Sequence, residues 1–147
     1  MIRATGRVSV DRPAEEVFDF VADLENEPEF NPDASNIRKT TDGPIGLGTT
    51  YEEDVKPLGH FVVRIHEYER PTLLGFDARN PRADIRVLFR FTPRGAATDV
   101  AAEIEMAMKG PLRLLEPILR PMVQRMYDRK RGPMLKQAVE RARAGPV

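Results

Sequence analysis

The chain has 147 residues, with 23 basic and 23 acidic side chains and no cysteine. This length corresponds to one domain, so we expect residues 1–147 to form a single unit. The absence of cysteine excludes disulfides, thiol nucleophiles and cysteine-ligated metals, and a net charge of zero argues against general nucleic-acid binding. Because no apolar run approaches a signal peptide or the ~20 residues of a membrane span, we expect a cytoplasmic protein.

The N-terminal third predicts one strand followed by two short helices. Residues 2–10 alternate between apolar and polar side chains, which is typical of a half-buried strand. Asp11 is placed to cap the helix that follows, with Pro13 near its first turn. A second short helix is expected over residues 24–32, interrupted by Pro28.

Six more strands are predicted between short Gly- and Pro-containing turns. They span residues 35–41, 49–56, 60–69, 73–79, 83–92 and 98–108. Connections this short favour antiparallel pairing of neighbouring strands.

From residue 112 to residue 143 the apolar spacing becomes helical. Prolines interrupt this segment, so we expect bends near Pro117 and Pro121 and a kink or a new start at Pro133. A curved sheet with one apolar face needs a cover, and only this long helix is large enough. The predicted fold class is therefore α+β.

Many inward-facing positions of the sheet and the last helix carry aromatic, methionine or leucine side chains. They are Phe76, Phe89, Phe91, Met106, Met108, Leu115, Leu119, Met122 and Met126. Such a set forms either a filled core or a flexible, polarisable lining that adapts to a ligand. The spacing alone leaves both interpretations open.

Glu53 is the most informative polar residue. Strict alternation places it on the same strand face as Thr49, Tyr51 and Val55, which favour the interior. An inward carboxylate is costly unless it is paired or protonated. Glu53 is therefore expected either at a cavity mouth in contact with water or as a polar anchor or general base with a raised pKa.

The two histidines share a predicted strand. His60, His66 and Tyr68 fall on the face opposite the apolar positions that begin at Phe61, so both histidines are expected to face solvent unless a bulge shifts the register. At about 20 Å apart they cannot share a metal ion directly. We expect no metal site and no cofactor, and His66 is a weaker catalytic candidate than Glu53.

Charge is unevenly distributed along the chain. Residues 13–33 contain carboxylates and no lysine or arginine, whereas basic side chains dominate from Arg113 onward. This pattern is typical of solvated acidic and basic helices that lie near each other. The alternative is a basic helix that makes weak contact with a membrane surface or an acidic partner. On the same helix, Tyr127 is either a ligand-contacting hydroxyl or an ordinary half-buried tyrosine.

Several short motifs follow one another in a distinctive order. They are Arg12-Pro13-Ala14-Glu15-Glu16-Val17-Phe18, Val21-Ala22-Asp23-Leu24-Glu25-Asn26, Phe30-Asn31-Pro32, Gly46-Leu47-Gly48-Thr49-Thr50, Glu67-Tyr68-Glu69-Arg70-Pro71 and Thr98-Asp99-Val100. With the predicted elements, this order resembles the START-like superfamily, also called the Bet v 1-like or helix-grip fold, and within it the polyketide cyclase/dehydrase-type proteins. Phe30 stands where family members often carry tryptophan.

The resemblance implies a curved antiparallel sheet wrapped around a long C-terminal helix, with a deep cavity between them for a lipid, a polyketide or another hydrophobic molecule. Three functions remain open. The first is a binding or carrier protein, with Phe30, Tyr51, Glu53 and Tyr127 among the expected contacts. The second is a cyclase or dehydratase that uses Glu53, Tyr51 or His66 as an acid or base. The third is an interaction module that uses the basic helix and has a collapsed core.

Overall fold

The structure is a computed structural model that describes residues 1–126, 128 and 131–144. Its elements in chain order are β1 (Ile2–Val10), α1 (Ala14–Ala22), the 3₁₀ helix η1 (Leu24–Glu29), β2 (Ala34–Lys39), β3 (Thr50–Val55), β4 (Gly59–Glu69), β5 (Leu73–Arg79), β6 (Ala83–Arg94), β7 (Ala97–Met108), the 3₁₀ helix η2 (Gly110–Leu115), α2 (Glu116–Met126) and α3 (Gly132–Ala144). The predicted strands are all present, and their ends differ from the prediction by two residues at most.

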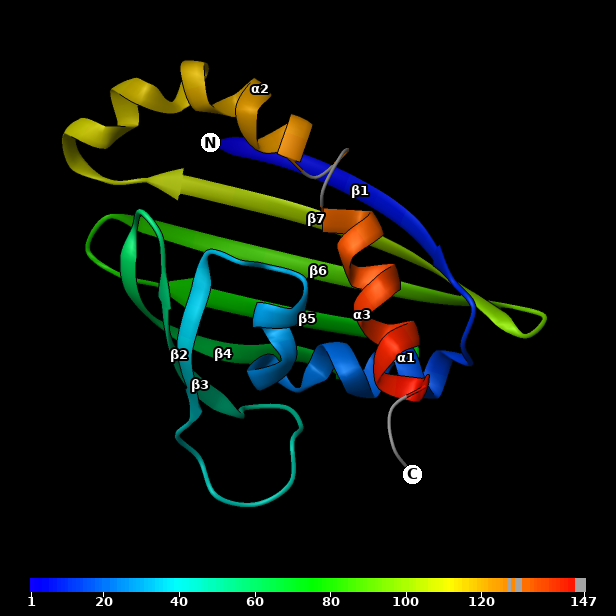
Figure 1. Cartoon of the computed structure of the whole chain (residues 1–147). Coiled ribbons are helices and arrows are strands. Elements are labelled where there is room, and N and C mark those ends of the chain that lie inside the picture. Colours follow the sequence, from blue (N-terminus) through cyan, green and yellow to red (C-terminus); the bar gives the residue numbers. More distant parts are fainter. Residues whose placement is uncertain (127, 129–130, 145–147) are drawn as a thin grey trace.

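Seven antiparallel strands form one open sheet in the order β1-β7-β6-β5-β4-β3-β2. Strands β2 to β7 follow one another as a meander. Strand β1 pairs with β7 on the outer side of the meander, from Ile2↔Met106 to Val10↔Thr98. Strand β1 is therefore an edge strand, and α2 lies along it beside the N-terminus (Figure 1). The predicted α+β class with a single antiparallel sheet is confirmed.

Strand β4 contains a bulge that corrects one sequence prediction. His66 and Glu67 both lie opposite Gly75, so the alternation shifts by one residue. Tyr68 consequently faces inward, where its ring packs edge-on against Phe18 with 5.1 Å between centroids, instead of sharing the outer face with His66. Gly75 leaves room for the bulge, because a Cβ atom there would lie 2.9 Å from the His66 ring.

Helix α1 does not begin as predicted. Its N-cap residue is Pro13, and no side chain caps the helix. The expected cap, Asp11, instead contacts α3: its backbone N–H donates to Glu140 at 2.9 Å, and its carboxylate lies 3.3 Å from the ammonium group of Lys136. The predicted cap was wrong because the charged α3 competes for Asp11.

The C-terminal segment forms two helices instead of one long helix. The 3₁₀ helix η2 passes into α2 at Glu116, one residue before Pro117, while Pro121 lies inside α2. The kink or new start expected at Pro133 is found as a change of direction: α3 begins at Gly132 and does not continue the line of α2 (Figure 1). As a result α2 follows the β1 edge, and α3 crosses the inner face of the sheet (Figure 1).

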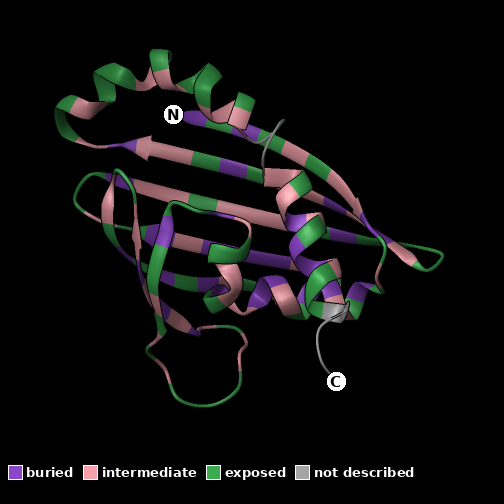
Figure 2. Ribbon diagram, viewed as in Figure 1, coloured by how far each residue is buried: buried purple, intermediate pink, exposed green. Residues whose placement is uncertain are grey.

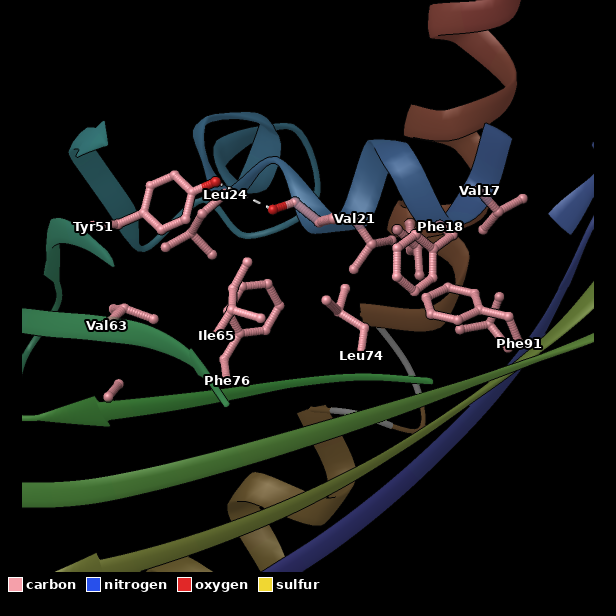
Figure 3. Close-up of a cluster of buried hydrophobic side chains, with 14 of the residues drawn as sticks. Val17, Phe18, Val21, Leu24, Tyr51, Val63, Ile65, Leu74, Phe76 and Phe91 are labelled. Carbon is pink, nitrogen blue, oxygen red and sulfur yellow. Dashed lines mark hydrogen bonds between the residues drawn. The ribbon is translucent and has the colours of Figure 1, made fainter. Parts of the chain in front are cut away.

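One end of the inner face is a filled core beneath α1. Phe18 points from α1 toward the sheet and contacts Phe91, with ring centroids 5.3 Å apart. Nearby, the Tyr51 hydroxyl donates to the backbone carbonyl of Ala22 at 3.3 Å, and Leu74 is fully buried (Figure 3). This packing anchors α1 and leaves the rest of the inner face to be covered by η1, α2 and α3.

Candidate functional site

A cavity of about 370 Å³ lies between the sheet and the helices. The sheet side is formed by residues of β1 and of β3 to β7, and the other side by the end of α1, η1, α2 and the first turn of α3. Its apolar wall comprises Val21, Leu24, Phe30, Phe61, Val63, Phe76, Ala78, Ile85, Val87, Phe89, Val100, Ala102, Ile104, Met106, Met108, Leu119, Met122, Val123, Met126 and Leu135. A volume of this size falls within the range of about 300–1,000 Å³ that is typical of small-molecule sites.

Side-chain exposure on β6 shows that this space is open. Ile85, Val87 and Phe89 alternate toward the inner face of the sheet, yet they are only half-buried. Phe91, on the same face but under α1, is 2% exposed. The difference arises because α1 packs over Phe91, whereas the three preceding inward residues face the cavity.

Most of the predicted aromatic and methionine set is brought together in this wall. Phe30, Phe76, Phe89, Met106, Met108, Leu119, Met122 and Met126 all line the cavity. The rings of Phe76 and Phe89 meet edge-on with 6.4 Å between centroids. Met122 is also 59% exposed, which places it at the boundary between the cavity and solvent.

Other predicted residues lie elsewhere. Tyr51 and Phe91 belong to the filled core, and burial raises the pKa of the Tyr51 hydroxyl to about 12. Leu115 is 43% exposed and faces away from the cavity, because the 3₁₀ turn of η2 rotates it away from the apolar positions of the C-terminal segment that line the cavity. His66 lies on the outer face, 3.7 Å from Asp77. Tyr127 falls outside the described residues.

Glu53 lies inside the cavity wall. It is opposite Phe61 in the β3–β4 ladder and is only 5% exposed, as the alternation predicted. Burial raises the pKa of the Glu53 carboxyl far above its ordinary value near 4.5, and a hydrogen bond with Glu27 and the charge of Glu27 raise it further. The protonated form of the Glu53 carboxyl is therefore favoured, and because the side chain is only 5% exposed, the alternative of a water-exposed carboxylate at the mouth is wrong.

The partner carboxyl of Glu53 comes from η1, which folds over the end of β3. Glu27 accepts a hydrogen bond from the Asn31 amide at 3.1 Å through Oε1. Its Oε2 atom and Glu53 Oε2 are both buried, and the structure shows no protein N–H group donating to either. The hydrogen bond and the charge that Glu27 contributes both favour the protonated form of Glu53.

Arg131 adds a cation to this end of the cavity. It lines the wall just before α3, and its charge opposes part of the rise in the pKa of Glu53. Sequence reasoning missed both Glu27 and Arg131. Each looked like one charge within a longer acidic or basic stretch, and no local pattern distinguishes the residue that the fold turns inward.

Within the described residues, no three His, Cys, Asp or Glu side chains gather in a way that could hold a metal ion. Across the same part of the chain, no helix has the length and apolar character needed to cross a membrane. The cavity is thus lined by a largely apolar wall and, toward η1 and the start of α3, by the carboxyl groups of Glu27 and Glu53 and the side chain of Arg131; Arg7, Asn31, Asp33 and Lys56 also belong to its lining.

Solved structures with this fold are numerous, but their sequences are distant. A conserved protein from Geobacillus kaustophilus superposes with a TM-score of 0.75 at 9% identity, covering 96% of this chain and 97% of the other. A START superfamily protein from Mycobacterium smegmatis gives 0.71 at 16% identity, with 95% and 98% covered. The Zhui aromatase/cyclase from Streptomyces sp. R1128 gives 0.72 at 16% identity, with 99% and 98% covered.

At these identities the structural similarity establishes the fold alone. A comparison with curated protein sequences finds no match. The family model described as "Polyketide cyclase / dehydrase and lipid transport" matches residues 1–140, which is nearly the whole chain. The chain therefore belongs to the polyketide cyclase/dehydrase and lipid transport family.

Proposed function

We propose that this protein binds a hydrophobic small molecule whose apolar body fills the cavity and whose single polar group reaches the Glu53–Glu27 carboxyl pair. The observation that carries this proposal is the cavity itself: Ile85, Val87 and Phe89 of β6 and Ala102 and Met106 of β7 remain half-buried around about 370 Å³ of space. Apolar burial would supply most of the affinity, at roughly 25 cal/mol per Å².

The carboxyl pair limits the polar group of the ligand. A protonated carboxyl donates a hydrogen bond, so a carbonyl, an ether or a hydroxyl oxygen is a suitable partner for Glu53. A carboxylate ligand is a poor match at this end unless it reaches Arg131, because burial and Glu27 already disfavour negative charge at Glu53. Lipids and polyketide-like molecules with oxygen at one end meet these requirements.

Binding can be tested with Nile red, an apolar dye whose fluorescence rises when it leaves water. We expect Val87→Trp to abolish the fluorescence rise, because Val87 faces the cavity from β6 and an indole would occupy the space. Leu88→Trp is the matched control, since the neighbouring residue points to the outer face. Native mass spectrometry of the purified protein would identify any ligand that co-purifies.

The proposal fails if wild-type protein gives no signal with Nile red and carries no co-purifying molecule. It also fails if the dye binds the Val87→Trp and Leu88→Trp variants equally while both retain the native circular dichroism spectrum. In that case the dye would be bound at the surface.

A second function, acid–base catalysis on a polyketide-like substrate, is favoured by one observation. The cavity contains a buried carboxyl, Glu53, whose pKa is raised by burial and by Glu27 beside it, and a carboxyl whose protonated form is favoured in this way can act as a proton donor. Glu53→Gln keeps the size and a hydrogen-bond donor but cannot transfer a proton. If the protein is an enzyme, this variant should bind the substrate and lose turnover; equal turnover by both proteins would exclude Glu53 as the acid.

A further inference from the structure

Helix α2 has an unusual orientation, with its polar side chains turned toward the protein. Gln124 accepts a hydrogen bond from the Thr5 backbone N–H at 3.0 Å and donates one to the Thr5 carbonyl at 2.9 Å. Arg120 donates to the Met1 carbonyl at 3.1 Å, and Glu116 binds the Met1 amino group at 2.6 Å. These side chains occupy the free hydrogen-bonding groups of the edge strand β1.

Several apolar side chains of the same segment face solvent. We define the α2 outer face as Leu114, Leu115, Ile118 and Met122, whose exposed fractions are 81%, 43%, 64% and 59%. Exposed residues colour much of η2 and α2 in Figure 2. A contiguous exposed group of large aliphatic side chains is typical of an interaction site.

The exposed charged side chains of η2 and α2 are basic. Arg113, Arg120 and Arg125 are exposed, whereas Glu116, the one carboxylate of η2 and α2, is 13% exposed and holds the amino terminus. These two helices therefore present positive charge to solvent. A second copy of this chain is a poor partner for this face, because a symmetric contact would bring the arginines of both copies together.

The α2 outer face also adjoins the cavity. Leu119, Val123 and Met126 line the cavity from the inner side of α2, and Met122 both lines it and reaches solvent. One helix thus covers the ligand space on one side and presents exposed aliphatic groups among arginines on the other.

We infer that the α2 outer face docks on the surface of an anionic lipid bilayer, with the aliphatic side chains inserted among the headgroups and the arginines against lipid phosphates. An aliphatic surface with flanking arginines matches the interfacial region of such a bilayer in both polarity and charge. The position of Met122 sets the cavity mouth against the bilayer, so that a hydrophobic ligand passes between them without crossing water. The second part of this inference rests on the proposed ligand-binding function, and the docking itself does not.

Docking can be tested by co-sedimentation of the full chain with vesicles. We expect binding to vesicles of phosphatidylcholine mixed with phosphatidylglycerol, and weak or no binding to phosphatidylcholine alone. The variant Leu114→Ser/Ile118→Ser should weaken binding at least tenfold, since it removes two apolar insertions. The variant Arg113→Gln/Arg125→Gln should weaken it by about fivefold for each charge removed, and binding should fall as salt is raised.

Matched controls lie on surfaces far from α2 in sequence. Leu47→Ser changes a leucine that is 69% exposed in the loop before β3, and Arg79→Gln removes an exposed arginine at the end of β5. Both should bind vesicles like the wild type. All four variants alter exposed side chains, so circular dichroism should show native folding.

The inference is wrong if wild-type protein does not sediment with anionic vesicles, or if the control variants lose binding as much as the α2 variants. It is also wrong if the chain elutes as a dimer that Leu114→Ser/Ile118→Ser converts to a monomer, which would make the α2 outer face a protein interface. Nile red binding measured without vesicles separates the two proposals: the α2 variants should retain it, and its absence from the wild type would overturn only the ligand-binding function.

Discussion

At the scale of single residues, Glu53 is where sequence and structure agree most usefully. Strand alternation alone placed this carboxyl among apolar neighbours, and the structure buries it in the cavity wall. The neighbouring Glu52 points to the outer face, where Arg38 and His60 bind it and lower its pKa. Two adjacent glutamates therefore have opposite pKa shifts because the pleat turns one inward and the other outward.

Glu53 should make the stability of the protein fall as the pH rises. Its pKa is raised in the folded state, so the unfolded chain ionises first, above about pH 4.5, and the native state is progressively disfavoured from there upward. We expect Glu53→Gln to raise the free energy of unfolding by about 2 kcal/mol at neutral pH and by little at pH 4. Urea unfolding of both proteins across this range measures the difference.

Glu52→Gln is the control with the opposite sign. Its lowered pKa stabilises the folded state above the pKa of the unfolded chain, and that contribution is lost as the pH falls. Its removal should cost a little stability at neutral pH. Parallel stability curves for the wild type and Glu53→Gln would mean that Glu53 is ionised in the folded protein.

At the scale of elements, the C-terminal segment separates into two helices with different tasks. Gly132 and Pro133 start α3, whose Leu135 and Val139 are buried against the core. Helix α2 has no buried residue and is held to β1 largely through polar side chains. Apolar spacing predicted the helical state of both segments, but it could not predict that α2 would turn part of its apolar side chains outward.

The attachment of α2 depends on Gln124. We expect Gln124→Ala to lower the free energy of unfolding by about 1 kcal/mol, because the variant loses two hydrogen bonds to the Thr5 backbone. The loss is small because water can replace the side chain at this partly solvated edge of the sheet. Amide exchange at Thr5 should accelerate, as its N–H loses its acceptor. The control is Gln137→Ala, which changes an exposed glutamine on α3 and should alter neither the free energy of unfolding nor the exchange rate. Unaltered exchange at Thr5 in the Gln124→Ala variant would contradict this account.

At the scale of the whole molecule, the cavity results from how the helices share the inner face. Helix α1 fills one end around Phe18, and α2 is drawn to the β1 edge, so the space over β6 and β7 is enclosed by the helices but not filled by side chains. The fold thus leaves apolar side chains around open space. A ligand that fills this space would bury those side chains and stabilise the folded protein.

Filling the cavity should therefore stabilise the protein. Ala102 lines the cavity from β7, and we expect Ala102→Leu to raise the free energy of unfolding by about 1–2 kcal/mol by burying additional apolar surface. Ala101→Leu is the matched control, because Ala101 pairs with Arg7 and Arg90 on the outer face. Thermal and denaturant unfolding measure both. A loss of stability in Ala102→Leu, as expected for overpacking, would mean that the space is already filled.

The sequence by itself determined the elements and the faces of the strands. Period-two alternation is a local property of the pleat, so it predicted the strands, the antiparallel meander and the inward position of Glu53. Alternation did not predict the register shift at the β4 bulge, because a bulge depends on the neighbouring strand, where Gly75 makes room for His66.

Only the tertiary structure decided which inward residues surround a void and which pack together. Phe91 and Phe89 have the same alternation, yet one is covered by α1 and the other faces the cavity. The pairing of Glu53 with Glu27 and the nearby charge of Arg131 likewise join segments far apart in the chain. Such features depend on where the helices lie over the sheet, and long-range packing sets that arrangement rather than any local periodicity.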